Sequence, residues 1–403
     1  MFRTVNLGAF AGQYLWFEGH TMRIVEVDGI YTEAAEADMI YLTAGQRASV
    51  LVSTKNDSLS NFAFVGSMDQ TLFDKIPKGL NPNVTGWLVY DNANPLPKPT
   101  NLDTFTPFDD FKLVPKDAEP LMDKVDYSFN LDVKMDNLAN GIDYAFFNDH
   151  TYTRPKVPTL YTALTSGALA TNPVIYGSNT NAFVLKKNDV VEIILNNNDK
   201  GRHPFHLHGH TFQAIARSEQ NAGNWIGNET FPAVPMKRDT FMAPPNGNIV
   251  LRFRADNPGV WLFHCHIEWH VASGLVATMI EAPLDLQNPI TLPSDHLQAC
   301  KTQNTPVAGN AAGNTNDLLD LTGEDLPPPE LPARFTAKSI VAFVFIVLSA
   351  FAGMAVIAWY GSLEIGKKEP GKEQAAEIET MAPTLPSAEV PAPTMVVAGA
   401  SRS

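Results

Sequence analysis

Seven of the ten histidines in this 403-residue chain stand in two short clusters, and these clusters constrain its fold more than any other feature. The first reads HPFHLHGH, from His203 to His210, and the second reads HCHIEWH, from His264 to His270. Successive side chains of a β-strand point to opposite faces, so the two histidines that flank Cys265 face away from it. The clusters therefore predict two sites, one on each face of a strand.

Cys265 is the central candidate ligand of the first site. A thiolate with two imidazoles in a trigonal set is the arrangement of blue copper sites. His270 follows Cys265 by five residues, across a loop that can fold back, whereas His203 lies 62 residues upstream on a different strand. Cys265, His270 and His203 are thus candidate ligands of one copper ion.

The second site falls on the opposite face of the same strand. His264 and His266 flank Cys265, and His206 and His208 share their alternation, so the four imidazoles can meet behind the strand. A structural zinc site is the alternative, but it takes four ligands and leaves several of the seven histidines unexplained. A cysteine whose neighbours bind a second metal centre is suited to electron transfer between the two centres.

The composition favours an all-β fold. The chain has 30 prolines, 26 glycines and only 18% charged residues, which suits short strands joined by turns. Two cysteines exclude a disulfide scaffold, and a net charge of −14 argues against nucleic acid as a partner. Strand patterns, rich in β-branched residues and bounded by turn residues, occur at 21–52, 125–133, 182–195, 211–216, 248–254 and 275–281.

The C-terminal part contains a candidate membrane span. Residues 339–360 carry no charge over 22 residues, which is long enough to cross a bilayer. The alternative is a buried core helix. Basic residues follow the span at Lys367, Lys368 and Lys372 and favour a cytoplasmic C-terminus. Three glycosylation sequons, at Asn56, Asn83 and Asn228, favour an extracytoplasmic position for the rest of the chain.

The two histidine clusters resemble the paired copper motifs in the last domain of multicopper oxidases. VNLGAFAGQYLWFEGH, NGIDYAFFN, PKVPTL, IYGSNT and ADNPGVWLFHCHIEWH resemble fungal cell-surface ferroxidases of reductive iron uptake. The resemblance covers essentially residues 1–365, and the single C-terminal span fits this branch because secreted laccases lack one. It implies a plasma-membrane protein with extracellular copper domains, and an iron permease in the same membrane as its partner.

The resemblance implies a fold and a domain order. The fold is a pair of cupredoxin-like Greek-key β-sandwiches, one partial and one complete, followed by a transmembrane helix. The expected segments are a partial second cupredoxin domain, a third cupredoxin domain with the copper motifs, an acidic proline-rich stalk, a transmembrane helix and a disordered cytoplasmic tail, at residues 1–110, 111–300, 301–337, 338–360 and 361–403.

The resemblance also implies a role for each site residue. It makes His203, Cys265 and His270 the ligands of a type 1 copper, with the non-coordinating Leu275 in the axial position. Glu268 corresponds to an acidic residue that supplies protons for oxygen reduction; the alternative is a surface glutamate between two ligands. The remaining copper ligands are His206 for a type 2 copper and His208, His264 and His266 for a type 3 pair.

Two aspartates bear on the substrate. A ferroxidase binds Fe²⁺ close to the type 1 copper through hard oxygen ligands that favour Fe³⁺. By resemblance Asp199, four residues before His203, and Asp74 belong to such an iron site; a lone aspartate in a loop is otherwise a turn residue or a solvated charge. Fe(II) and O₂ are then the substrates. A laccase-like oxidase of phenols is the alternative, and it needs neither aspartate.

The chain departs from the family pattern in one respect. The family's first domain carries two further His-x-His motifs, but outside the two clusters this chain has only the isolated His20, His150 and His296. Cys300 likewise stands where the family has a cysteine bonded to the first domain. The expectation is that the chain begins inside the second domain, holds half of the ligands for oxygen reduction and lacks that activity. A non-catalytic copper-binding fragment is therefore a further alternative.

Overall fold

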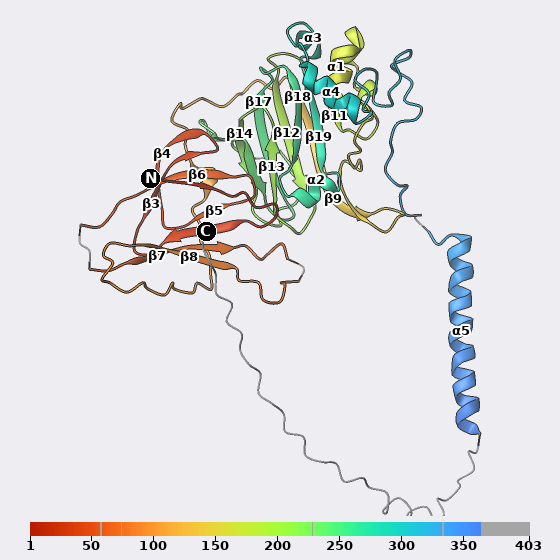
Figure 1. Ribbon diagram of the computed structural model, residues 1–403, viewed down its shortest axis with the longest axis horizontal. Helices are drawn as coiled ribbons and strands as arrows, with labels where there is room; N and C mark the ends of the chain where they lie inside the picture. Colours follow the sequence, from red (N-terminus) through yellow and green to blue (C-terminus); the bar gives the residue numbers. More distant parts are fainter. Residues whose placement is uncertain (57–58, 74, 228, 333, 364–403) are drawn as a thin grey trace, which may run out of the picture. The chain divides into compact units, whose positions relative to one another are not determined.

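The computed structural model describes residues 1–403 except 57–58, 74, 228, 333 and 364–403. Its N-terminal part is a sandwich of two four-stranded sheets, ordered β1-β6-β3-β4 and β5-β2-β7-β8 (Figure 1). All pairings within these sheets are antiparallel. The strands are β1 Phe2–Val5, β2 Gln13–Phe17, β3 Met22–Val27, β4 Ile30–Ala37, β5 Ile40–Leu42, β6 Arg47–Val52, β7 Phe62–Met68 and β8 Asn83–Leu88.

A second, larger sandwich follows. Its sheets are ordered β10-β9-β12-β17-β14-β15 and β11-β19-β18-β13-β16. The strands are β9 Tyr127–Asn137, β10 Asp143–Phe147, β11 Ala182–Leu185, β12 Val190–Asn197, β13 His203–Leu207, β14 Phe212–Arg217, β15 Met236–Arg238, β16 Thr240–Ala243, β17 Gly247–Arg254, β18 Gly259–Cys265 and β19 Val276–Glu281.

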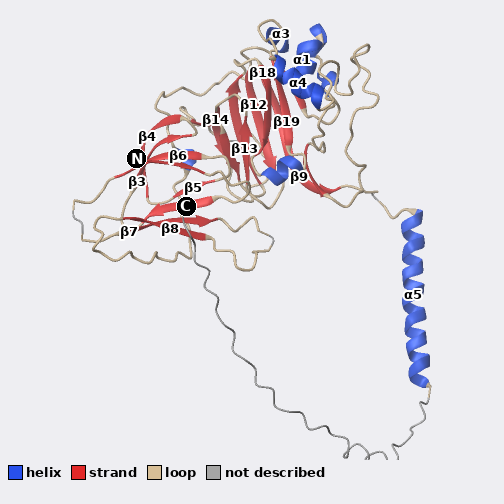
Figure 2. Ribbon diagram, in the orientation of Figure 1, coloured by secondary structure: helices blue, strands red, loops and turns tan. Residues whose placement is uncertain are grey.

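Short helices border the second sandwich. Three of them gather at one end of its sheets, as Figure 2 shows: α1 Thr159–Thr165, α3 Pro283–Leu286 and α4 Ser294–Thr302. The fourth, α2 Glu268–Ala272, follows β18 directly and carries His270. Single 3₁₀ turns occur at Asp110–Lys112, Gly167–Thr171 and Pro173–Tyr176. The all-β class expected from the sequence is confirmed.

One buried apolar cluster runs through both sandwiches. It includes Phe17 and Val50 from the first, and Leu131, Phe205 and Phe263 from the second, each at most 2% exposed. Burying this many apolar side chains in one cluster stabilises the contact between the sandwiches as well as each sandwich. Residues 1–331 accordingly form a single compact unit.

Most of the segment expected to be an acidic, proline-rich stalk, residues 301–337, belongs to the compact unit. The compact unit extends to Leu331. Asn310 is fully buried and its side-chain amide donates to the carbonyls of Leu318 and Asp320, and the backbone N–H of Ala311 donates to Ile175 O. These hydrogen bonds hold residues 310–320 in a turn and attach the segment to the second sandwich.

The second unit contains one long helix, α5 Ala337–Ser362. Its mean hydropathy over 18 residues is 2.8, none of that window is buried, and the helix is long and apolar enough to cross a membrane. A core helix of this composition would be covered by other elements. The expected disordered tail lies outside the described residues from 364 onward.

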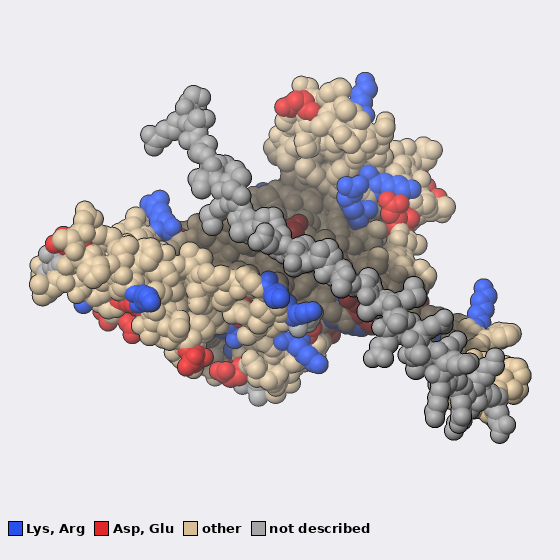
Figure 3. Space-filling model, turned by 60° about the horizontal axis from the view of Figure 1, so that its bottom comes forward, with Lys and Arg blue, Asp and Glu red and all other residues tan. Residues whose placement is uncertain are grey.

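Charged side chains are mixed on the face shown in Figure 3. Small groups of Lys and Arg lie beside Asp and Glu, and the described residues of this face form no continuous basic field.

Candidate metal centre

Strands β13 and β18 bring the two histidine clusters together. They pair antiparallel, with Phe205 opposite Cys265 and His206 opposite His264. Directly opposite residues share a face, so Cys265 lies on one face and the facing pair His206 and His264 on the other. This register produces the two-sided arrangement that the alternation predicts.

The first face holds His203, Cys265 and His270. Cys265 Sγ lies 3.6 Å from His203 Nδ1 and 3.4 Å from His270 Nδ1, and the two Nδ1 atoms are 3.1 Å apart. Among the described residues, these are the three side chains whose ligand atoms converge closely enough to hold one metal ion. The donor set, one thiol and two imidazoles, fits copper by the chemistry of its atoms.

The protonation states of this group also fit a cation. Burial raises the pKa of the Cys265 thiol, so that a thiolate there needs a nearby positive charge. Burial lowers the pKa of His270 to about 3, which keeps its ring neutral and able to donate a lone pair. Metal ligation requires both a thiolate and neutral imidazoles.

Asp199 fixes the ring of His203. His203 Nε2–H donates to Asp199 Oδ2 at 2.9 Å, which leaves the Nδ1 lone pair directed toward Cys265. A carboxylate bonded to the far nitrogen of a metal-binding histidine is the usual way to set its tautomer. The same hydrogen bond from His203 lowers the pKa of Asp199 to about 2. Asp199 is therefore ionised, and its side chain remains 31% exposed.

Leu275 lies next to this group. It is fully buried, its N–H donates to His270 O, and its carbonyl accepts from the Cys265 N–H at 3.3 Å. A buried leucine offers no lone pair to a metal ion. Its position in the backbone between His270 and Cys265 is compatible with an axial residue that does not coordinate.

The second face gathers His206, His208, His264 and His266. Ring centroids within this four-histidine group lie 4.9–5.7 Å apart, and His208 Nε2 is 2.9 Å from His264 Nε2. The four rings are close neighbours, but their nitrogens do not converge on a single point as those of the first group do.

Backbone carbonyls orient two of these rings. His206 Nδ1–H donates to Asp239 O at 2.8 Å, and His264 Nδ1–H donates to Cys265 O at 2.8 Å. Each bond leaves Nε2 with its lone pair. Burial lowers the pKa of His264 to about 4 and also lowers the pKa of His208 and of His266, so these rings are neutral.

The other candidates occupy separate positions. Glu268 is the exposed first residue of α2, and its charge acts on His266. His210 pairs with the buried Glu281 at 2.7 Å and stays apart from the four-histidine group. Asp74 lies outside the described residues.

Three residues of this centre have no sequence signal. Asp239 accepts from His206 and pairs with Arg47, which comes from the first sandwich. Gly45, also from the first sandwich, lies against the ring of His266. Asp239 lies 33 positions from His206, Arg47 lies 192 positions from Asp239, and Gly45 is more distant still from His266, so only the folded chain reveals these contacts.

A histidine–cysteine–histidine group held in a cupredoxin-like β-sandwich defines a class of copper proteins, and this group resembles a type 1 copper site. Sequence patterns of the multicopper oxidase family match residues 1–93 and 152–285, more than half of the chain. The chain belongs to the multicopper oxidase family.

Two iron transport multicopper oxidases are similar to this chain over most of its length. The iron transport multicopper oxidase fetC of Epichloe festucae is 58% identical over 94% of this chain and 61% of its own length. The iron transport multicopper oxidase FET3 of Gibberella zeae is 56% identical over 96% of this chain and 63% of its own length. The chain thus spans about 60% of the length of these relatives.

The fold is that of solved family members. The crystal structure of Fet3p, described as a multicopper oxidase that functions in iron import, is similar with a TM-score of 0.77 and 48% identity, over 80% of this chain and 64% of that one. A Botrytis aclada laccase mutant has a TM-score of 0.61 at 22% identity, over 80% of this chain and 57% of that one, and shares the fold alone.

Proposed function

We propose that this chain acts as a ferroxidase in iron uptake. The balanced reaction of a complete enzyme oxidises four Fe²⁺ to Fe³⁺ and reduces one O₂, with four protons, to two waters. This chain carries half of the histidine ligands that oxygen reduction needs, so we expect it to accept electrons from Fe²⁺ and not to reduce O₂ by itself. The iron transport oxidases at 56–58% identity support this assignment. In the chain itself, the observation that supports this proposal is the hydrogen bond between Asp199 and His203. This bond joins a partly exposed carboxylate to the buried histidine–cysteine group.

His203, Cys265 and His270 are the proposed ligands of a type 1 copper, with Leu275 as its axial neighbour. The proposed type 2 ligand is His206, and the proposed type 3 ligands are His208, His264 and His266. Bound copper supplies a one-electron acceptor at the first group and the site of oxygen reduction at the second. Burial lowers the pKa of His208, His264, His266 and His270, which keeps these four rings neutral. Hydrogen bonds to backbone carbonyls set the tautomers of His206 and His264.

Asp199 is the proposed iron ligand of the described part. Its carboxylate is ionised and reaches solvent, so Fe²⁺ can bind without removing a proton. Hard oxygen ligands stabilise Fe³⁺ more than Fe²⁺, which assists loss of the electron. Iron bound to Asp199 lies one hydrogen bond from His203. Asp74 is proposed as a second iron ligand on the resemblance alone, and it is not described here.

Further proposals concern protons and location. Glu268 is proposed, on the family resemblance, to supply protons to the four-histidine group; it lies two residues after His266, at the start of α2. Helix α5 is proposed to anchor the chain in the plasma membrane, with the copper sites outside and the C-terminus in the cytoplasm. An iron permease in the same membrane is the proposed partner, since the relatives are iron transport proteins.

The test measures electron transfer from iron into the first group without oxygen. The full chain, loaded with Cu²⁺, is mixed anaerobically with Fe²⁺ or with a hydroquinone, and bleaching of the blue absorption is followed. Asp199→Ala should slow bleaching by Fe²⁺ by at least about tenfold, the effect of losing roughly 1.4 kcal/mol of transition-state stabilisation. Bleaching by the hydroquinone should change little, because an organic donor needs no hard ligand.

Asp199→Asn is the matched control for the hydrogen bond, because its amide oxygen can still accept from His203 but its neutral side chain binds iron poorly. It should resemble Asp199→Ala with Fe²⁺ and the wild type with the hydroquinone. Equal slowing of both donors in both variants, with the blue absorption intact, would contradict the iron role and favour oxidation of phenols.

A further inference from the structure

The turn between β5 and β6, residues 43–46, together with Arg47 at the start of β6, comes from the first sandwich and lies against the four-histidine group of the second. We call this segment the β5–β6 turn. At its centre Gly45 adopts a φ of +80°. A Cβ atom built on Gly45 would lie 2.3 Å from His266 Cδ2 and 2.6 Å from His266 Nε2. The backbone of Gly45 therefore packs directly against the ring of His266, and no side chain fits between them.

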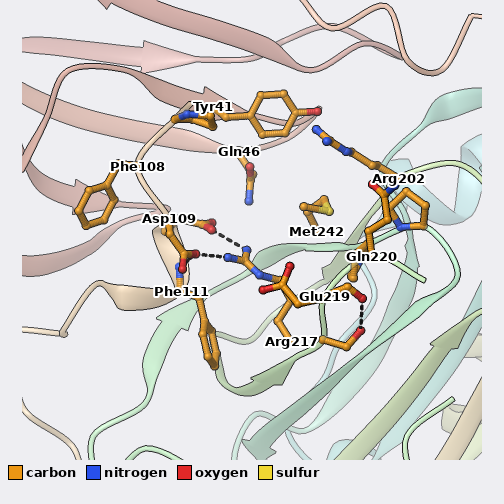
Figure 4. Close-up of a pocket in the computed structure, with 15 residues that line it drawn as sticks. Tyr41, Gln46, Phe108, Asp109, Phe111, Arg202, Arg217, Glu219, Gln220 and Met242 are labelled. Carbon is orange, nitrogen blue, oxygen red and sulfur yellow. Dashed lines mark hydrogen bonds and ion pairs between the residues drawn. The ribbon is translucent and has the colours of Figure 1, made fainter. Parts of the chain in front are cut away.

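Gln46 attaches this turn to the second sandwich. Its side chain is buried, its Nε2 donates to Thr240 O at 3.0 Å, and its Oε1 accepts from the Thr43 N–H. Thr240 Oγ1 in turn lies 3.1 Å from His206 Nδ1. Figure 4 shows Gln46 beside a cavity of about 490 Å³, with Tyr41 of the first sandwich on one side and Met242 of the second on the other.

Arg47 makes the ionic part of the contact. Its Nη1 and Nη2 donate to the two carboxylate oxygens of Asp239 at 2.8 and 2.7 Å, and Nη1 also donates to Gly45 O at 2.9 Å. A two-pronged arginine–carboxylate pair fixes the orientation of both groups. The backbone carbonyl of Asp239 accepts the Nδ1–H of His206, so Arg47 holds the residue that sets the ring of His206.

We propose that the β5–β6 turn of the first sandwich positions His206 and His266, with Gly45 and Arg47 as its positioning residues. Gly45 limits where the His266 ring can lie, and Arg47 acts on His206 through Asp239. The first sandwich is thus a part of the metal centre and not only a spacer. This inference rests on the proposed function only in taking the two histidines as copper ligands.

The test measures how accessible each histidine ring is to a chemical reagent in the copper-free full chain, purified in detergent. Diethyl pyrocarbonate modifies neutral imidazoles, and mass spectrometry gives a rate for each histidine. Gly45→Ala should raise the rate at His266, because the added methyl group displaces the ring. Arg47→Gln should raise the rate at His206. We expect each rate to rise by more than about twofold, which corresponds to a free-energy difference above the roughly 0.5 kcal/mol typical of surface substitutions without structural contacts.

Matched controls separate positioning from general loosening. Gly141→Ala places an alanine at a φ of +74° where a Cβ meets nothing within 4 Å, so it carries the backbone strain without the clash. Arg47→Lys keeps the positive charge, so the modification rate of His206 should be lower in this variant than in Arg47→Gln, though still above the wild-type rate. The exposed His150 and His296 should react alike in all variants. Blue absorption after copper loading, which needs only His203, Cys265 and His270, should survive.

Wild-type rates at His266 in Gly45→Ala and at His206 in Arg47→Gln would overturn the inference. So would an equal rise at His266 in Gly141→Ala. If Gly45→Ala does not fold, the two Arg47 variants decide, and identical rates in both would reject the inference. The readout uses neither iron nor copper turnover, so it is independent of the outcome for Asp199.

Discussion

The imidazole of His203 contacts Asp199 through one ring nitrogen and Cys265 through the other. Nε2–H donates to Asp199, and Nδ1 offers its lone pair beside Cys265. The ring must be neutral for this division, and its orientation depends on the carboxylate. A change at Asp199 therefore acts on the copper-binding group as well as on iron, which is why the asparagine control above is needed.

The thiol of Cys265 should be the source of the blue colour. Cys265→Ser should abolish the intense thiolate-to-copper absorption of the copper-loaded chain, because a hydroxyl is a poor ligand for this soft site. The chain supplies its own control, since Cys300 is remote in sequence and bonds to Tyr161 at 3.4 Å. Cys300→Ser should leave the spectrum unchanged. A blue spectrum in Cys265→Ser would show that the assignment is wrong.

Burial of His270 and His264 should make stability depend on pH. Their pKa values in the folded chain are about 3 and about 4, against an ordinary value of 6.5. Between these values the unfolded chain binds protons that the folded chain excludes. Stability is therefore complete above pH 6.5 and falls as the pH drops from about 6.5 toward 4, by at most about 1.4 kcal/mol per unit for each ring.

The measurement is the melting temperature of the copper-free chain between pH 7 and 4.5. His270→Leu should flatten the profile, because it removes one of the buried rings whose pKa is lowered by burial. Asp199, with its pKa near 2, contributes only below this window. A wild-type melting temperature that stays constant or rises on acidification would contradict the burial argument.

The sequence predicts some of these residues and not others. The alternation around Cys265 places His264 and His266 on the far face, and β13 and β18 have that geometry. Asp239 and Gly45 could not be predicted, because an aspartate in KRDT or a glycine in TAGQ has no local signal for its distant partner. Local periodicity specifies a face of a strand, but not which remote loop lies against it.

At the scale of elements, the link from α2 to β19 sets the position of His270 and Leu275. Gly274 adopts a φ of +105° there, and a Cβ on it would lie 2.0 Å from Thr151 Oγ1 and 2.9 Å from Tyr152 N. Gly274→Ala should lower the free energy of unfolding by about 3 kcal/mol, from backbone strain and overpacking. It should also weaken the blue absorption, because α2 carries His270.

Urea unfolding and the spectrum of the same samples measure both effects. Gly141→Ala again provides the strain without the clash and should cost about 1 kcal/mol with a normal spectrum. If Gly274→Ala and Gly141→Ala lower the free energy of unfolding by the same amount, the close packing of Gly274 against Thr151 does not stabilise the connection between α2 and β19.

Element boundaries illustrate a second limit of the sequence. The run at 182–195 is one strand pattern in the sequence but two strands in the fold, β11 and β12, separated by a turn in which Asn188 has a φ of 65°. The two strands belong to different sheets of the sandwich. A period-two pattern continues across such a turn, because both sides of the turn lead into the same core.

At the scale of the whole compact unit, a buried arginine ties the sandwiches together. Arg238 of β15 is 1% exposed and its Nε donates to Asp28 Oδ2 at 2.6 Å, in the turn between β3 and β4. Arg238→Leu should destabilise the unit by roughly 3–5 kcal/mol, because it leaves the carboxylate of Asp28 buried without its main partner. Denaturant unfolding measures the loss.

Removing both charges tests this explanation. The double variant Arg238→Leu, Asp28→Leu should recover part of the stability, since no charge then stays buried without a partner. If the double variant is less stable than Arg238→Leu by the full cost of a second independent change, the two side chains are not coupled across the sandwiches.

The position of Cys265 between two histidines has a consequence for electron tunnelling. His264, Cys265 and His266 are consecutive, and the His264 ring is also bonded to the Cys265 carbonyl. In the proposed function, an electron passes from the first group to the four-histidine group, and the shortest covalent path between them runs through bonds of fixed length within one strand. Loop movements, crystal packing and most substitutions elsewhere leave that path unchanged. The covalent path between the two groups therefore keeps its length, while substitutions around the groups can still change their redox potentials and the choice of substrate.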